Sequence, residues 1–282
     1  FFFISGFLEG EKRRSISEKK QAIVKKAKRL MVPYFFLTVV TAVLKLLFGA
    51  FARNPLNYST LAVDVLIGRN NPNGGLWFLY ALFVISIFGI LFDNVSRTVL
   101  AGVMFVLYML NTVVLKQSGY IVGFFLSYAW IYFMGGAVRK HLFEIIKNSE
   151  LLMSVKGIVL IAVVSVGYMM LAFVSIYKSQ SWSLATAVTV IGVFLLFVIA
   201  VQIEHYHCGE KLWMVLGDYG MDIYMIGYYV QQAIFVVCGK ILGFDYLVYA
   251  WMMLFLGLIA PIFLSKYVVR KNHMLSTLIL GR

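Results

Sequence analysis

The sequence predicts an all-α fold, a polytopic bundle of transmembrane helices. Of the 282 residues, 62% are hydrophobic and only 13% are charged, whereas a soluble globular domain is roughly half apolar. The apolar residues also occur in long runs, several of which reach the roughly 20 residues that a helix needs to cross the hydrocarbon core. We therefore interpret residues 1–282 as a single integral-membrane domain.

About eight full spans are expected, preceded by half a helix. The apolar string 1–7 is too short to span, and positive charge follows it, whereas a signal peptide carries its positive charge ahead of the apolar run. We expect this string to be the cytoplasmic end of a helix that begins upstream, so that the chain is a fragment. The eight spans are expected near residues 31–52, 76–93, 98–115, 119–138, 155–177, 183–201, 213–238 and 245–267.

The connections between these spans alternate in charge. Nine Lys and Arg residues fall in the basic loop 8–30, and ten more fall in later connections on the same side. Five fall on the opposite side, and Lys45 lies within a span. Because cytoplasmic connections carry the excess of Lys and Arg, the basic loops are predicted to face the cytoplasm. This topology explains the net charge of +13, so no nucleic-acid partner is expected.

Two strings at the ends of spans carry more than apolar residues. The string 28–34 leads into the first full span, with Pro33 expected in the first helical turn, where its missing N–H costs nothing, and Tyr34 expected at the head-group level. Trp77 begins the second span, after the predicted external loop 53–75, which is rich in Asn, Gly and Pro. An interfacial Trp is by itself an ordinary membrane anchor.

The span 213–238 carries a polar stripe. Two neighbouring helical faces hold its side chains, with Asp222, Tyr229 and Gln232 on one face and Tyr224, Tyr228 and Gln231 on the other. Polar groups at membrane depth usually face a protein interior or a wet cavity, so we favour a cavity for the Tyr and Gln residues. For Asp218 and Asp222, capping and the helix dipole are at least an equal alternative.

The cysteines do not predict a metal site. Cys208 and Cys238 form no Cys-x-x-Cys or Cys/His ligand pattern. His205 and His207 precede Cys208, but a short His-rich interfacial loop explains this string more simply. We assign no metal ligand.

Four strings together resemble the acyltransferase 3 family, and most closely its fucose O-acetylase-like branch. They are 2–7, the end of the basic loop at 28–34, Leu76–Leu79 and Leu216–Tyr224, in the family's order. The resemblance implies ten helices in an intact member, located in the bacterial inner membrane. It also implies transfer of an acyl group, usually acetyl, from cytoplasmic acyl-CoA to a hydroxyl of a surface sugar, glycolipid or polysaccharide precursor, without a tightly bound cofactor.

The resemblance and the chemistry together predict site residues. Arg13, Arg14, Lys28 and Arg29 are expected to meet the phosphates of acyl-CoA, because guanidinium and ammonium groups pair strongly with phosphate. Anionic lipid head groups are the alternative partner for this charge. The substrate cavity is expected to be lined by six residues, Trp77, Tyr80, Asp222, Tyr224, Tyr228 and Gln231.

No catalytic residue is assigned within the chain. The family's proposed catalytic His lies in the first helix, which the resemblance places upstream of residue 1. The His that often follows the family's late Ile-Tyr element is not found here, where Gly227 and Tyr228 stand. His205 and His207 lie in a predicted cytoplasmic loop and receive no family role. The 282 residues alone are therefore expected to insert in a membrane but to transfer little acyl group.

Two other classes of protein share part of this pattern. A transporter or flippase of a lipid-linked sugar or exopolysaccharide would have the same spans and polar stripe, but such proteins often show repeated halves, and none is visible here. A membrane anchor or assembly partner without chemistry would not need the polar stripe or the four family strings. A helix upstream of residue 1 that carries a His would favour the enzyme.

The charge pattern predicts the topology. A reporter fused within 12–29 or 139–156 is expected to score cytoplasmic, and one within 53–75 is expected to score external, because nineteen basic residues lie on one side and five on the other. A protease-protection or enzyme-reporter assay measures this. If the sites in 12–29 and 53–75 reported on the same side, the span count would be wrong.

Overall fold

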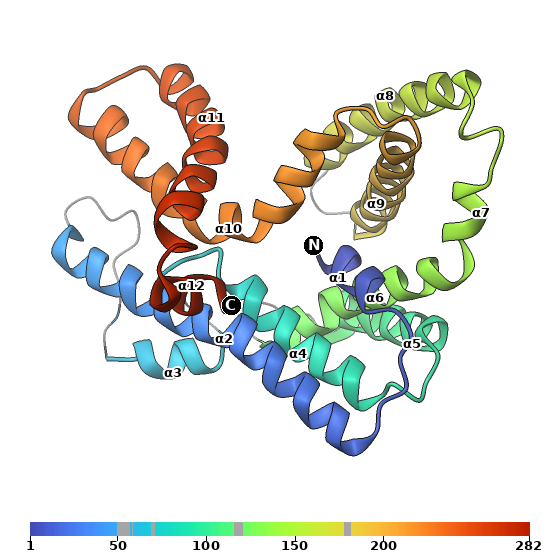
Figure 1. Ribbon diagram of the computed structural model, residues 1–282, viewed down its shortest axis with the longest axis horizontal. Coiled ribbons are helices and arrows are strands. Elements are labelled where there is room, and N and C mark those ends of the chain that lie inside the picture. Colours follow the sequence, from blue (N-terminus) through green and yellow to red (C-terminus); the bar gives the residue numbers. More distant parts are fainter. Residues whose placement is uncertain (50–56, 58, 69–70, 116–120, 178–181) are drawn as a thin grey trace. The chain divides into compact units, whose positions relative to one another are not determined.

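A computed structural model shows a helical protein (Figure 1). It describes residues 1–49, 57, 59–68, 71–115, 121–177 and 182–282. Within these ranges every regular element is a helix, and no strand occurs. Seven of the described helices are long and apolar enough to cross a membrane. The predicted all-α, polytopic membrane fold is confirmed.

Each predicted span corresponds to an observed helix. Six of the seven long helices are α2 (Ile16–Leu47), α6 (Ile121–His141), α8 (Val155–Tyr177), α9 (Trp182–His205), α10 (Glu210–Ile234) and α11 (Tyr246–Leu264), and the seventh is α5 (Arg97–Leu110) together with the π-helical residues that follow it. The eighth predicted span is α4 (Trp77–Leu91), an apolar helix of 15 residues. Three π-helical segments extend α5, α10 and α11, namely η2 (Asn111–Leu115), η3 (Phe235–Ile241) and η4 (Ser265–Val269).

The chain forms two compact units. Unit 1 contains Phe1–Arg13, Asp93–Lys116 and Leu126–Met214, and unit 2 contains Arg14–Phe92, Gln117–Phe125 and Val215–Arg282. Four short helices complete the described elements, namely α1 (Phe2–Glu9), α3 (Leu61–Leu66), α7 (Phe143–Lys147) and α12 (His273–Leu280). The single-domain organisation stays a prediction.

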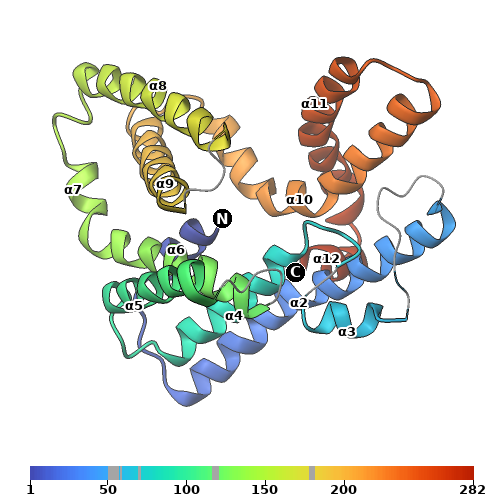
Figure 2. The ribbon, with the colours of Figure 1, turned by 180° about the vertical axis from the view of Figure 1, so that it is seen from behind.

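In unit 1, α1 packs backbone to backbone against α6. A Cβ atom on Gly6 would stand 1.7 Å from the carbonyl oxygen of Tyr132, and one on Gly135 would stand 2.1 Å from that of Phe3. Small residues that let two backbones approach are typical of helix contacts in membranes. The opening string is helical, as the sequence predicts. In the same unit α8 and α9 run side by side in both views (Figures 1 and 2).

In unit 2, α2 begins much earlier than the sequence analysis expected. The Ser15 side chain accepts a hydrogen bond from the Glu18 amide, and the Glu18 carboxylate accepts one from the Ser15 amide at 2.7 Å. This capping box starts a helix, and the Lys, Gln and Ala residues that follow are strong helix formers. Residues 16–30 are therefore helix, and the basic loop predicted over 8–30 is a loop only between α1 and α2.

The longer helix also changes the place of Pro33 and Tyr34. Pro33 lies in the interior of α2, so its predicted position in the first turn is wrong, because the capping box starts the helix at residue 16. Tyr34 is 0% exposed and packs inside the unit rather than at a surface. An interior proline leaves one backbone carbonyl of the helix without its usual donor.

The other helix contacts of unit 2 involve α4, α12 and α11. α2 packs against α4 and α12, and both views show α12 beside α2 (Figures 1 and 2). α10 approaches α11 at two glycines: a Cβ on Gly227 would stand 3.3 Å from the carbonyl oxygen of Gly257. Unit 2 is thus built from helices that pack on α2 and α10.

We expect Gly135→Ala to destabilise unit 1. Its methyl group would overlap the Phe3 carbonyl, and overpacking costs about 1–3 kcal/mol. Gly102→Ala, on α5, is the matched control, because its Cβ would have nothing within 4 Å and Ala is favoured over Gly in helices by about 1 kcal/mol. Thermal unfolding in detergent measures both variants. An unchanged melting temperature for Gly135→Ala would contradict the contact between α1 and α6.

Candidate functional site

A polar network lies inside the apolar helices of unit 2. We define it by eight residues from three segments: Tyr34, Thr38 and Thr41 of α2, Asn71, Asn73 and Gly75 of the connection before α4, and Tyr224 and Tyr229 of α10. Polar groups at membrane depth are costly unless they are hydrogen-bonded within the protein. The bonds among these residues show how the unit satisfies them.

On α2 the three polar side chains point to both other segments. The Tyr34 hydroxyl donates to the carbonyl oxygen of Val65 at 2.8 Å. Thr38 accepts from the side-chain amide of Asn71 at 2.7 Å, while the hydroxyls of Thr41 and Tyr229 lie 2.8 Å apart. One face of α2 therefore holds the connection before α4 on one side and α10 on the other.

The connection before α4 is shaped by two asparagines. The Asn71 side-chain oxygen accepts from the Asn73 amide at 2.9 Å, and the Asn73 side-chain oxygen accepts from the Gly75 amide at 3.0 Å. Asn73 is 2% exposed. The Tyr224 hydroxyl then donates to the carbonyl oxygen of Gly75. These bonds satisfy the irregular backbone, which can lie at membrane depth only when it is buried in protein.

This connection runs along the apolar half of α2. Together with α3, it contacts α2 at two points, where Val65 of α3 bonds to Tyr34 and Asn71 bonds to Thr38. Tyr34 lies five residues beyond Arg29, or about 7 Å along the helix axis. The described part of the loop 53–75 therefore lies against the apolar half of α2. Residues 50–56, 58 and 69–70 of this region lie outside the described residues.

Three predicted cavity residues lie in or beside the network. Tyr224 belongs to it. Tyr80 stacks on Tyr34, with ring centroids 5.3 Å apart, and donates to the carbonyl oxygen of Leu66 at 2.7 Å. Trp77 stacks on Phe124 at 4.7 Å, at the start of α4. The structure thus brings Tyr80 and Tyr224 together with polar residues of α2.

The other predicted cavity residues have different neighbours. The Gln231 side chain packs on α11, where a Cβ on Gly257 would stand 2.9 Å from its Nε2 atom. The ring of Tyr228 contacts that of Tyr229 edge to face. Asp222 is 0% exposed and accepts from Ser265. Asp222 and Gln231 therefore face α11 and η4 rather than the network.

Asp222 also forms a buried ion pair. The Arg270 Nε and Nη2 atoms both lie 2.7 Å from the Asp222 Oδ2 atom, and Nη2 also lies 2.7 Å from the carbonyl oxygen of Asp218. The guanidinium group stacks over Tyr219 at 3.9 Å. From the sequence, Arg270 is one of the basic residues predicted to face the cytoplasm. In the structure it also binds a specific carboxylate, that of Asp222, 48 residues earlier.

In unit 1, two arginines hold the end of α1. Arg139 donates to the carbonyl oxygens of Phe7 at 3.0 Å and Leu8 at 2.8 Å. Arg97 is 2% exposed, and its Nε atom donates to the carbonyl oxygen of Gly10 at 3.0 Å. Basic side chains of this kind satisfy the last carbonyl groups of a helix. These residues therefore have a structural role beyond topology.

Glu11 completes this cluster. Its carboxylate accepts from the Arg97 amide at 3.0 Å and from Lys140 at 2.8 Å. The hydrogen bond from Lys140 lowers the pKa of the Glu11 carboxyl below its usual range, and it outweighs the burial that would otherwise raise the pKa. The charged form of Glu11 is therefore favoured in the folded protein.

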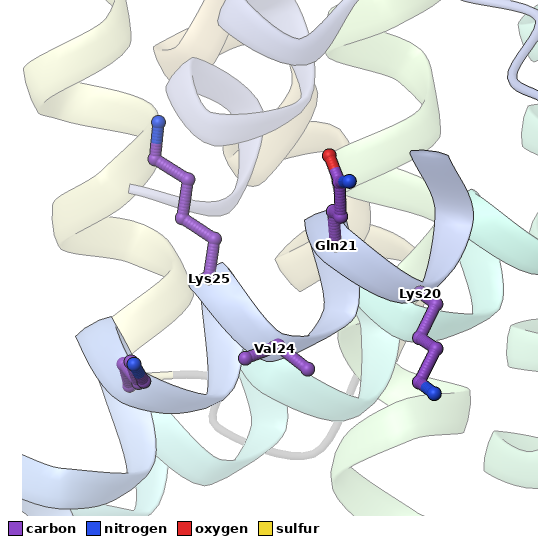
Figure 3. Close-up of a pocket in the computed structure, with 5 residues that line it drawn as sticks. Lys20, Gln21, Val24 and Lys25 are labelled. Atoms are coloured by element: carbon purple, nitrogen blue, oxygen red, sulfur yellow. The ribbon is translucent and has the colours of Figure 1, made fainter. Parts of the chain in front are cut away.

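The basic half of α2 carries an open pocket of about 420 Å³. It is lined by Lys20, Gln21, Val24, Lys25 and Lys28. Figure 3 shows Lys25 and Gln21 projecting the same way from the helix and Lys20 projecting the opposite way. Only Lys28 was among the predicted donor-binding residues, so the structure adds two lysines to this surface.

The other predicted donor-binding residues are divided between the units. Arg29 is exposed on α2, directly after Lys28. Arg14 is half-buried in unit 2, whereas Arg13 is exposed in unit 1. The structure therefore groups Lys28 and Arg29 with the lysine pocket.

The network offers hydroxyl and amide groups, but its eight residues include no carboxylate or imidazole. Such groups both donate and accept hydrogen bonds, so they can orient a hydroxyl-rich ligand or a carbonyl oxygen. The four histidines lie elsewhere: the Nε2 atom of His141 is 3.0 Å from the Thr98 hydroxyl, His205 and His207 are exposed, and His273 begins α12. Within the network only tyrosine hydroxyls could exchange a proton with a ligand, so a His, Asp or Glu base would have to come from elsewhere.

The metal-binding residue types are scattered in the described ranges. There, no three His, Cys, Asp or Glu side chains lie close enough together to hold a metal ion. Cys208 is exposed and Cys238 is buried, and both are free thiols.

A family model described as an acyltransferase domain matches residues 1–270. The chain belongs to the acyltransferase 3 family. The resemblance of the four sequence strings to this family is confirmed, while the branch stays a prediction, and the apolar helices agree with a multi-pass membrane acyltransferase. Neither the comparison with curated proteins nor the comparison with solved structures gave a match. Residues 271–282, which include α12, lie beyond the matched region.

Most of the network of this acyltransferase was not predicted from the sequence. Tyr34, Thr38 and Thr41 recur at the spacing of one helical face within an apolar span, so this stripe was visible in the sequence. Asn71 and Asn73 gave no comparable signal, because Asn is common in any polar loop. Their role follows from contacts that only the folded chain makes.

The Glu11 cluster predicts a pH dependence. Because the folded-state pKa is lowered, the contribution of Glu11 to stability is present above the pKa of the unfolded chain and is lost as pH falls through the folded-state pKa. We expect the melting temperature of the wild type to fall more steeply on acidification than that of Glu11→Gln. Glu150→Gln, at an exposed carboxylate of the same unit, controls for charge removal. Equal slopes for wild type and Glu11→Gln would contradict this role.

Proposed function

We propose that this acyltransferase moves an acyl group, which we expect to be acetyl, from cytoplasmic acyl-CoA to a hydroxyl of a cell-surface sugar or polysaccharide precursor. The family match over residues 1–270 is the observation that carries the proposal. The polar network supports it, because a membrane anchor without chemistry does not need hydroxyl and amide groups bonded between three segments at membrane depth.

The donor is proposed to bind at the basic half of α2. Acyl-CoA carries phosphates and cannot cross the bilayer, so it must be held at the cytoplasmic face. Lys28, with the two other lysines of its pocket, and Arg29 suit these phosphates, and Arg14 of the same unit is proposed to add to this rim. Arg29 is the strongest candidate, because a guanidinium group can bind phosphate through two parallel hydrogen bonds.

The acceptor is proposed to bind at the network. Tyr80 and Tyr224, which bond to backbone carbonyls there, and Trp77 present aromatic surfaces and hydroxyls of the kind that fix a sugar's orientation. Tyr228, beside Tyr229, is proposed to extend this surface. Asp222 forms an ion pair with Arg270, so we propose for it a structural role at the end of α11 rather than contact with the acceptor.

The proposed reaction needs one proton transfer. The acceptor hydroxyl oxygen attacks the thioester carbonyl carbon, the C–O bond forms, and the C–S bond breaks to release CoA as a thiol. A general base takes the hydroxyl proton and passes it to the leaving sulfur. Histidine is the side chain that most often serves as such a base, and the eight residues of the network include none. Donor groups of the network are suited to stabilise the negative charge on the carbonyl oxygen.

Arg29→Ala is expected to raise the KM for acetyl-CoA by roughly 10- to 100-fold, because a hydrogen bond to a charged group is worth about 1.5–3 kcal/mol. Membranes that contain the protein are supplied with labelled acetyl-CoA, and the acetyl label on surface glycans is followed by mass spectrometry. Lys211→Ala removes an exposed basic residue predicted to lie on the same side and is the matched control.

The possible outcomes test the transfer reaction and the role of Arg29 separately. Acetyl label that appears on glycan only when the protein is present supports the transfer reaction. Movement of unmodified glycan across the membrane without labelling would indicate a transporter instead. An unchanged KM in a folded Arg29→Ala protein would remove Arg29 from the donor site.

A further inference from the structure

The last helix, α12, lies against the proposed donor-binding stretch of α2. The family match ends at residue 270, and α12 follows it. Both views show α12 beside α2, and the two helices are in contact (Figures 1 and 2). A segment outside the matched region therefore reaches the residues that we propose to hold acyl-CoA.

The start of this segment is fixed to α10. The buried Asp222 accepts hydrogen bonds from Ser265 and from Arg270, and Arg270 also donates to the carbonyl oxygen of Asp218. Asn272 then caps α12, because its side-chain oxygen accepts from two amides of the first turn at 3.0 and 3.2 Å. The direction in which α12 leaves η4 is thus set by a buried ion pair and a cap.

The end of α12 meets the backbone of Arg29. Gly281 caps the helix in the left-handed conformation, with φ 65° and ψ 30°. A Cβ atom there would stand 2.5 Å from the Arg29 Cα atom and 2.6 Å from its carbonyl oxygen. Leu280 and Leu30, the neighbours of these two residues, are 2% and 3% exposed. Only glycine can make this contact without moving the backbone of α2.

We propose that Gly281 is a positioning residue for the donor: by holding the backbone of Arg29, it sets where the guanidinium group meets the phosphates of acyl-CoA. The proposal rests on the proposed function, since it requires that Arg29 bind the donor. The Asp222–Arg270 pair fixes one end of α12 and the glycine contact fixes the other. Hydrogen bonds to phosphate are short and directional, so a displaced backbone weakens them without removing any donor group.

A matched pair of glycine substitutions tests this role. Gly281 and Gly243 both have φ of +65°, so Ala is strained at either position, but a Cβ on Gly243 would have nothing within 4 Å. We expect Gly281→Ala to raise the KM for acetyl-CoA by about 3- to 10-fold, a fraction of the effect expected when the charged hydrogen bond is lost altogether. Its kcat is expected to stay unchanged, and Gly243→Ala is expected to keep the wild-type KM.

A second pair covers the case in which Gly281→Ala does not fold. Leu280→Ala removes buried side-chain atoms beside the contact, so that the helix end is loosened rather than pushed away. Met274→Ala, at a side chain of α12 that is 69% exposed, is its control. Melting temperatures of all four variants, measured in detergent, show which of them are folded before their kinetics are compared.

The results distinguish this inference from the proposed function. A raised KM with unchanged kcat in Gly281→Ala or Leu280→Ala, and not in its control, supports the positioning role. If Arg29→Ala raises the KM while Gly281→Ala and Leu280→Ala, wherever they fold, both keep the wild-type value, the positioning role is overturned and the donor site stands. If Arg29→Ala has no effect on the KM, the donor site itself is overturned, and the role of Gly281 with it.

Discussion

Polar groups surrounded by apolar helices must find hydrogen-bond partners within the protein, and this constraint organises unit 2. The hydroxyl of Tyr34 is buried in the middle of α2 and bonds to the carbonyl oxygen of Val65, which fixes where the connection before α4 must run. The same requirement ties Asn73 to Gly75, and Gly75 to Tyr224 of α10. In hydrocarbon each unmade bond would cost several kcal/mol, so these segments have few alternative arrangements.

The helix α2 carries both the residues proposed to bind the donor and polar residues of the network where the acceptor is proposed to bind. Its first half carries the lysine pocket and Arg29, and its second half carries Tyr34, Thr38 and Thr41. A helix rises 1.5 Å per residue, so about 7 to 18 Å along the axis separate Arg29 from these three residues. A charged donor held at the first half could therefore present its acyl end toward the second half while both remain on one continuous element.

Part of the polar network could be predicted from the sequence, and the reasons why the rest could not are particular to each residue. The Tyr stripe of α10 signalled Tyr224 because polar residues stand out in an apolar span. The capping box at Ser15 and Glu18 was visible as a Ser-x-x-Glu pattern, and reading it would have placed the basic residues on a helix. Asp222 was predicted to line a cavity, but its partner Arg270 lies 48 residues later, in the turn that follows η4, and no local pattern links the two.

The sequence by itself determined the number and order of the apolar spans, and the family. A membrane helix satisfies its backbone hydrogen bonds within its own segment, so length and apolar composition suffice to locate it. Tertiary structure alone decided which side chains meet. Gly281 and Arg29 are 252 positions apart in the chain, and their close approach depends on how α12 leaves the Asp222–Arg270 ion pair. Contacts between helices depend on the packing of whole surfaces, which no spacing within a single helix encodes.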